Sequence, residues 1–147
     1  MRVGDICSRD VRTATRDQAL AEAARAMRDY RVGALIVIDP SDTKRRPIGI
    51  LTDRDIVRGQ LIRAADLFCL TVGEVMTPKP LTLAAELELT EAVEDLNEQG
   101  VRRAPVLDGS GALIGIVTLD DLLPAIAREL SELADLMGSQ SRRAAPR

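Results

Sequence analysis

Residues 49–56, Gly-Ile-Leu-Thr-Asp-Arg-Asp-Ile, return in altered form at residues 115–122, Gly-Ile-Val-Thr-Leu-Asp-Asp-Leu. Each copy predicts a short apolar strand that passes into a helix through Thr-x-x-Asp. The start of a helix presents free backbone N–H groups and the positive end of the helix dipole, which together can hold a phosphate. The acid of the motif can accept hydrogen bonds from hydroxyl groups, such as those of a ribose. We therefore interpret the two junctions as candidate ligand-binding elements.

The repetition extends over most of the chain. Residues 3–5 align with residues 72–74, and residues 20–39 align with residues 89–108. The turn at residues 40–47 is longer than its counterpart, after which the copies realign at the Thr-x-x-Asp motifs. The chain is therefore an internal duplication. Each copy carries apolar residues on one helical face: Leu20, Ala23, Ala24 and Met27 in the first, and Leu89, Ala92, Val93 and Leu96 in the second.

Both copies predict the same order of elements. A short extended segment leads into an amphipathic helix, two apolar strands follow around a turn rich in Gly, Pro, Asp and Ser, and a second helix begins at the Thr. The first amphipathic helix is expected over residues 17–30. The expected strands are residues 11–14, 34–38 and 48–51 in the first copy and residues 81–84, 104–107 and 113–117 in the second.

The segments outside this common unit carry predictions of their own. The second helix of the first copy is expected to end near Gly59, and residues 61–70 to form a helical connector with an apolar face. The last helix is expected to run from Thr118 with a kink or a restart at Pro124. Residues 138–147 are expected to be a frayed tail, with a basic interaction segment as the alternative. The apolar stripe of the last helix is expected to pack against a partner chain or the core and is too short for a coiled coil: Leu130, Leu133, Leu136 and Met137.

The duplication predicts how the chain folds as a whole. One copy has roughly 60–70 residues, for which a single core is marginal. Each copy also leaves apolar faces uncovered, so we expect an α+β fold in which two β-α-β-β-α units pack with pseudo-twofold symmetry. This packing places the two Thr-x-x-Asp junctions on either side of the interface. The expected boundaries are residues 1–61 for the first repeat, 62–71 for a connector, 72–130 for the second repeat and 131–147 for the helix end and a flexible tail.

The composition excludes several classes of function. The net charge is −3 and the only aromatic residues are Tyr30 and Phe68, which argues against a nucleic-acid partner. The absence of histidine removes His-dependent nucleophile systems and the commonest zinc ligand. Cys7 and Cys69 are expected to be buried or half-buried structural residues in a reducing compartment. No apolar run reaches membrane-spanning length and residues 1–10 lack a signal-peptide core, so a soluble, cytoplasmic protein without a membrane partner is expected.

Three stretches within the duplication carry a family resemblance when they are taken together and in order. They are residues 51–58 (LTDRDIVR), 72–77 (VGEVMT) and 101–106 (VRRAPV). The chain resembles a tandem pair of cystathionine-β-synthase (CBS) domains, also called a Bateman module, over residues 3–130. The resemblance implies a regulatory, ligand-binding unit and not an enzyme. It implies adenosine-containing ligands (AMP, ADP or ATP, and also NAD(H) or S-adenosylmethionine) in two clefts between the repeats, with no required cofactor and no metal. It also implies a homodimer in the form of a disc of four repeats, and a regulated protein partner that the sequence does not name.

The resemblance also implies roles for individual residues. In the family the Asp of the motif binds the ribose hydroxyls, the Thr lies by the ribose or phosphate, and residues before the second strand meet the phosphates. Arg102 and Arg103 can form charge-assisted bonds to phosphate, whereas their first-repeat counterparts Gly33 and Ala34 are uncharged. The primary cleft is therefore expected to contain Thr118, Asp121, Arg102, Arg103, Asp5, Asp10, Val11, Val32 and Gly33. The second cleft is expected to contain Thr52, Asp55, Glu74, Lys79, Pro80, Val101 and Arg102.

Each of these features also has a purely structural interpretation. Thr-x-x-Asp is a helix capping box that needs no ligand, and the acids near it are favoured by the helix dipole. The arginine pair can be a solvated pair near Glu98. The neighbouring acids can accept Mg²⁺ that arrives with ATP. Two other functions therefore stay open: a ligand-free assembly module, and a small phosphotransferase or hydrolase, which lacks support because the chain has no Gly-rich phosphate loop or nucleophile elbow.

Overall fold

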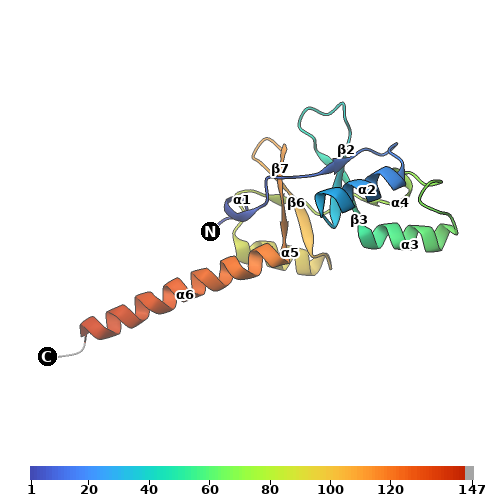
Figure 1. Cartoon of the computed structure of the whole chain (residues 1–147). Coiled ribbons are helices and arrows are strands. Elements are labelled where there is room, and N and C mark those ends of the chain that lie inside the picture. Colours follow the sequence, from blue (N-terminus) through green and yellow to red (C-terminus); the bar gives the residue numbers. More distant parts are fainter. Residues whose placement is uncertain (145–147) are drawn as a thin grey trace.

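The computed structural model describes the backbone of residues 1–144 and the side chains of residues 1–140. Two small sheets stand side by side, each with its own helices (Figure 1). The first half contains α1 (Val3–Ile6), β1 (Thr13–Ala14), α2 (Leu20–Tyr30), β2 (Ala34–Ile38), β3 (Pro47–Thr52) and α3 (Asp53–Arg63). The second half contains α4 (Val72–Val75), β4 (Thr77–Pro78), β5 (Leu83–Ala84), α5 (Leu89–Glu98), β6 (Arg103–Leu107), β7 (Leu113–Thr118) and α6 (Leu119–Ala144). The predicted α+β class and the repeated unit are confirmed.

The two sheets have the same pattern of strand pairing. The first sheet has the order β1-β2-β3-β4 and the second the order β5-β6-β7. In each, a short strand runs parallel to the next, which then pairs antiparallel with the strand that ends at the Thr of the motif. Ala34 is opposite Thr52 in the first sheet, and Arg103 is opposite Thr118 in the second. The start of the middle strand therefore lies beside the Thr-x-x-Asp junction of the same repeat.

The two repeats exchange their leading segments, residues 2–8 and 71–78. Val3 and Cys7 of the first repeat are buried in a cluster with Leu122 of the second. Val72 and Met76 of the second repeat are buried in a cluster of first-repeat residues, and β4 pairs with β3. The core of each repeat is completed by a segment of the other, which compensates for the small size of a single unit.

A third apolar cluster joins the two halves. Ile36 and Ile38 of β2 are buried against Leu113 of β7, with Ile50 and Ile116 at its edge. Because this cluster contains residues of both sheets, the interface between the repeats is itself an apolar core. The Thr-x-x-Asp junctions lie where β3 and β7 leave this core.

The connector differs from its prediction. The helix α3 continues past Gly59 to Arg63 and is closed by Ala64 in the left-handed conformation. Gly59 does not end the helix and instead permits the close approach of α4, because a Cβ there would lie 2.7 Å from a methyl carbon of Val75. Residues 65–70 are turns and not a helix, and Ile62 is exposed. Cys7 is buried as expected, but the prediction for Cys69 is wrong because it is exposed in this connector.

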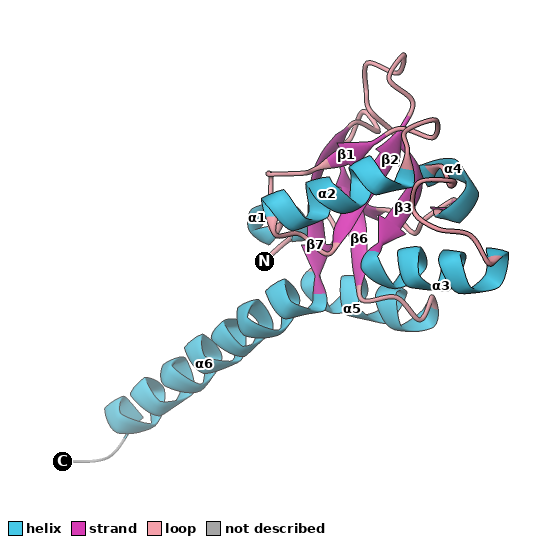
Figure 2. Ribbon diagram, turned by 45° about the vertical axis from the view of Figure 1, so that its right-hand side comes forward, coloured by secondary structure: helices cyan, strands magenta, loops and turns pink. Residues whose placement is uncertain are grey.

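The last helix also differs from its prediction. The helix α6 runs without interruption from Leu119 to Ala144 and leaves the body of the molecule (Figures 1 and 2). Pro124 removes one hydrogen bond close to the helix start, and the expected restart does not occur because the turns around it remain paired. Residues 138–144 are helical and not a frayed tail, while residues 145–147 of that prediction lie outside the described residues. The apolar stripe is 55–71% exposed and so does not pack on the core: Leu130, Leu133, Leu136 and Met137.

The described part of the chain contains no helix that is long and apolar enough to cross a membrane.

Candidate functional site

Both Thr-x-x-Asp motifs form complete capping boxes at their helix starts. The Asp55 carboxylate accepts the Thr52 N–H at 2.9 Å, and the Asp55 N–H donates to the Thr52 hydroxyl at 3.1 Å. Asp121 and Thr118 make the same pair of bonds at 2.8 and 3.3 Å. The capping bonds to each carboxylate use Oδ2, and Asp55 Oδ1 accepts only a long bond of 3.5 Å from the Thr77 hydroxyl among the described residues. The Oδ1 atom of each therefore stays available, and capping is compatible with contact to a ligand.

The larger inter-repeat pocket lies at the first of these junctions, and we call it the Asp55 pocket. It encloses about 370 Å³ between the end of β3 and the segment that precedes β6. The Thr77 hydroxyl lies 3.5 Å from Asp55 Oδ1, on the side of the carboxylate that the cap leaves open. Residues of both repeats line the pocket: Ile50, Thr52, Asp53, Arg54, Asp55, Thr77, Gly100, Val101, Arg102 and Arg103.

A smaller pocket lies at the second junction, and we call it the Thr118 pocket. It encloses about 190 Å³ between the end of β7 and the first repeat. Asp121 is not among the residues that line it. Its lining is Ser8, Asp10, Val11, Arg12, Val32, Gly33, Ala34, Ile36, Arg103, Ile116 and Thr118.

The structure bears out only part of the prediction for the arginine pair: Arg103 lines the Thr118 pocket as expected, but Arg102 does not. Arg102 lines the Asp55 pocket and not the Thr118 pocket, while Arg103 lines both. The reason is the small size of the first-repeat counterparts: the Arg103 guanidinium lies over Gly33, with Nη1 3.3 Å from where a Cβ would stand. The pair therefore reaches across the interface to the other repeat's motif. Among the described residues neither arginine side chain makes a hydrogen bond or an ion pair, so both guanidinium groups have donors available, and the interpretation as a solvated pair stays open.

The other predicted residues divide between the clefts and positions outside them. Asp10, Val11, Val32 and Gly33 line the Thr118 pocket, and Val101 lines the Asp55 pocket, as expected from sequence. Four predicted residues serve elsewhere or lie outside the pockets. Asp5 accepts the Arg2 N–H at 2.8 Å at the start of α1, and Glu74 accepts the Thr71 N–H at 2.8 Å at the start of α4. Hydrogen bonding from the Thr71 backbone lowers the pKa of Glu74. Lys79 and Pro80 line neither pocket.

Sequence reasoning missed two hydroxyl residues that the duplication could have revealed. Ser8 lines the Thr118 pocket and Thr77 lines the Asp55 pocket. The two occupy equivalent places in the aligned leading segments, directly after Cys7 and Met76. A repeated hydroxyl at the end of each leading segment was the available signal. Arg12 was missed because it carried no motif; its guanidinium stacks 3.8 Å from the centre of the Tyr30 ring and pairs with Asp10 at 3.2 Å.

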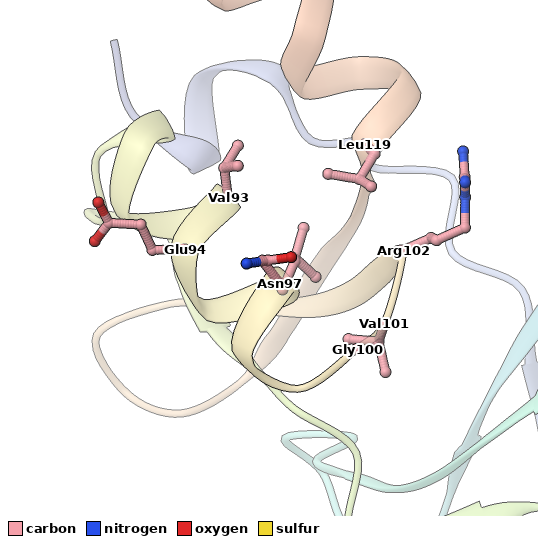
Figure 3. Close-up of a pocket in the computed structure, with 8 residues that line it drawn as sticks. Val93, Glu94, Asn97, Gly100, Val101, Arg102 and Leu119 are labelled. Atoms are coloured by element: carbon pink, nitrogen blue, oxygen red, sulfur yellow. The ribbon is translucent and has the colours of Figure 1, made fainter.

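A third hollow of about 380 Å³ lies on the outer side of the second repeat, between α5 and the start of α6 (Figure 3). Val93 and Leu119 stand on opposite sides of it, and Arg102 lies at its edge (Figure 3). Its walls are largely aliphatic, and no capping box opens into it, which sets it apart from the two inter-repeat pockets. In the part of the chain that the structure describes, no group of three or more His, Cys, Asp or Glu side chains is placed to hold a metal ion.

The sequence profile of the CBS domain family matches the chain twice, at residues 3–61 and 72–128. The chain belongs to the CBS domain family. The Methanopyrus kandleri protein MK0525 is 33% identical over 121 residues, which are 82% of this chain and 60% of MK0525. The chain thus spans less than two thirds of that relative.

Solved CBS structures match the whole fold. A CBS-domain protein from Burkholderia ambifaria superposes with a TM-score of 0.77 at 28% identity, over 86% of this chain and 93% of the other. The structure of CBSX2 in complex with AMP gives a TM-score of 0.72 at 28% identity, over 86% of this chain and 96% of CBSX2. Tandem CBS domains are therefore the architecture of this chain.

Proposed function

We propose that this CBS pair is a regulatory module that binds an adenosine-containing ligand in the Asp55 pocket. The observation that carries the proposal is the meeting of Asp55 Oδ1 with the arginine pair around one cavity. The carboxylate suits ribose hydroxyls, and guanidinium groups without carboxylate partners suit phosphate. Ile50 and Val101 offer aliphatic walls for a base. The volume falls within the usual range of roughly 300–1,000 Å³ for small-molecule sites, and CBSX2, a relative of the same fold, was solved with AMP.

This proposal reverses the ranking of the clefts that the sequence predicted. The Asp55 pocket is about twice as large as the Thr118 pocket and is lined by three arginines, Arg54, Arg102 and Arg103. The Thr118 pocket has two, Arg103 and Arg12, and the Arg12 guanidinium is already paired with Asp10. We assign the Asp55 pocket as the primary site and the Thr118 pocket as a second, weaker one. AMP, ADP and ATP are the ligands of choice because they carry a terminal phosphate. NAD(H) carries only a bridging diphosphate, and S-adenosylmethionine carries no phosphate.

The role that follows is regulatory and not catalytic. The lining of the Asp55 pocket contains no histidine, cysteine or serine nucleophile, and Asp55 Oδ2 is held by the Thr52 N–H at the helix start. A ligand in a cleft that both repeats line can change the relative orientation of the repeats, and a partner protein can detect that change. The ligand shifts the orientation only to the extent that it binds one orientation more tightly than the other.

A thermal-shift panel with AMP, ADP, ATP, NADH, S-adenosylmethionine and adenosine tests the proposal. A ligand at 100 times its dissociation constant adds about 2.7 kcal/mol of stability. At about 2–4 °C per kcal/mol for a chain of this size, the midpoint rises by roughly 5–10 °C. We expect the phosphorylated adenylates to raise the midpoint more than adenosine does. Unchanged midpoints with every adenosyl compound at millimolar concentration would favour a ligand-free assembly module.

We further propose that the chain forms a homodimer through the outer side of α3, α5 and the start of α6, which line one side of the molecule in both views (Figures 1 and 2). Val57 of α3 and Leu123 of α6 occupy equivalent positions in the two repeats and are 57% and 59% exposed. An apolar surface that is itself pseudo-symmetric is self-complementary, as a twofold interface requires. The hollow of Figure 3 adds an aliphatic recess to this surface.

The change Leu123→Glu should convert this dimer to a monomer, because it places a charge at the centre of the proposed interface. Light scattering should give twice the 15.9 kDa chain mass for the wild type and the single chain mass for the variant. Leu136→Glu is the matched control: it is also an exposed leucine of α6 but lies on the projecting part. A monomeric wild type, or a variant that stays dimeric, would contradict this interface, and loss of the dimer in Leu136→Glu would place it on the projecting part instead.

A further inference from the structure

One guanidinium lies between the two inter-repeat pockets. Arg103 lines the Asp55 pocket and also the Thr118 pocket. Its Nη1 and Nη2 atoms are 3.3 and 3.9 Å from the Cβ position of Gly33, and the Asp53 Oδ2 atom is 3.9 Å from the same point. Gly33 belongs to the wall of the Thr118 pocket and Asp53 to that of the Asp55 pocket. The Arg103 head group therefore stands at the partition that both pockets share.

No protein group in the described residues holds this head group in place. Arg103 is half-buried, yet its side chain makes no hydrogen bond and no ion pair there. An arginine carries five N–H donors and stays charged at any physiological pH. The partition thus offers unused donors that are accessible from either side, and the side chain is free to turn towards whichever pocket contains an anion.

The duplication supplies this group only once. The first-repeat counterpart of Arg103 is Ala34, and that of Arg102 is Gly33. Two helix starts capable of receiving a phosphate therefore share a single guanidinium at their boundary. Arg102 does not share this position, because it lines the Asp55 pocket but not the Thr118 pocket.

We propose that Arg103 couples the two pockets negatively: a phosphorylated ligand in the Asp55 pocket captures its guanidinium, so that the Thr118 pocket binds the next phosphate without it. The inference rests on the proposed function, which it extends from one site to the relation between two. Coupling between sites is reciprocal, so a phosphate in the Thr118 pocket weakens the Asp55 pocket by the same factor. Loss of charge-assisted hydrogen bonding predicts a factor of about 10- to 100-fold.

The phosphate, and not the nucleoside, transmits this effect. Adenosine carries no anion to draw Arg103 to one side, so adenosine in one pocket should not weaken the other. The chemistry of the ligand thus decides whether the pockets communicate, which gives an internal control that needs no mutation.

Isothermal titration of the full chain with AMP and with adenosine tests the inference. In the wild type we expect AMP to fill the Asp55 pocket first. The AMP affinity of the Thr118 pocket in the wild type should then be about 10- to 100-fold lower than its affinity in Asp55→Asn, where the Asp55 pocket is disabled. In Arg103→Gln the affinity of the Thr118 pocket should be the same with and without Asp55→Asn. In Arg102→Gln, the matched control, the Asp55 pocket weakens but the coupling persists at saturation. Adenosine should show no coupling in any variant.

The outcomes separate the two claims. Binding of neither AMP nor adenosine would remove the proposed function, and the inference with it. AMP affinity of the Thr118 pocket that is unaffected by the Asp55 pocket, AMP that never enters the Thr118 pocket, or coupling that survives in Arg103→Gln would overturn the inference alone. A Thr118 pocket that accepts AMP only in Asp55→Asn is the strongest form of the expected result.

Discussion

Replacing Asp55 with asparagine should weaken AMP binding by about 10- to 100-fold. Charge-assisted hydrogen bonds contribute roughly 1.5–3 kcal/mol, and each 1.4 kcal/mol is tenfold in affinity. Asparagine keeps an oxygen that can accept the Thr52 N–H, so the cap at the start of α3 survives. What it loses is the second carboxylate oxygen, the Oδ1 atom near Thr77, which we assign to the ribose hydroxyls. The ligand-induced rise in thermal midpoint should largely disappear, while the midpoint without ligand changes little.

The duplication offers a matched control for this change. Asp121→Asn removes the same charge from the same kind of capping box, at the start of α6. Because Asp121 does not line the Thr118 pocket and Arg102 is absent from it, this variant should keep most of the AMP response. If Asp121→Asn abolished the response and Asp55→Asn spared it, the ranking of the clefts proposed here would be wrong and the ranking predicted from sequence would hold.

Sequence reasoning reached the fold because the duplication made every element appear twice. The strand at residues 34–38 is found where it was predicted, and both Thr-x-x-Asp motifs open helices. The pattern also predicted the α+β class, because each copy contains segments with the apolar spacing of strands and segments with the apolar spacing of helices. Local spacing was sufficient for these features, since each depends on neighbours in the chain.

The placement of the arginine pair depended on information that spacing does not contain. Strand register puts Arg103 beside Thr118 of its own repeat, and this is what the sequence led us to expect. The side chain also extends over Gly33, which was expected in the same cleft, but it lines the Asp55 pocket as well, and Arg102 lines only that pocket of the two. The surface of the other repeat decides the direction in which a long side chain crosses the interface. The ranking of the two clefts therefore could not be predicted from the sequence of one strand.

The errors at the chain's helices have a similar origin. The glycine at position 59 predicts a helix end, but in the structure Gly59 allows α3 to pack closely against Val75 of α4. Residues 138–144 are small and polar and so predicted a tail, yet they continue a helix that is already formed, and extending a helix is easier than starting one. Pro124 likewise costs one hydrogen bond in a helix of 26 residues. In each case the context outweighed the local preference.

The docking of the first leading segment on the second repeat predicts that a side chain added at Gly115 destabilises the protein. This glycine of β7 lies under the leading segment of the first repeat: a Cβ added there would stand 2.6 Å from Cys7 Sγ and 2.9 Å from the Ser8 carbonyl oxygen. The segment cannot simply withdraw, because Ser8 and Ile116 exchange two backbone hydrogen bonds of 2.9 and 3.0 Å. Gly49 has the equivalent place in β3, under Met76, so the requirement for glycine is a property of the fold.

Gly115→Ala should therefore destabilise the protein by about 1–3 kcal/mol, the usual cost of overpacking, and lower the thermal midpoint by roughly 2–12 °C. Gly109→Ala is the control, since an added Cβ meets nothing within 4 Å in that turn and should leave the midpoint almost unchanged. Adding Cys7→Ala to Gly115→Ala should cost less than the two single changes summed, because it removes the clashing sulfur. An unaltered midpoint in Gly115→Ala would mean that the leading segment does not dock on the other repeat. Ser8 would then no longer be held at the Thr118 pocket, and the coupling proposed through Arg103 would lose one of the walls on which it depends.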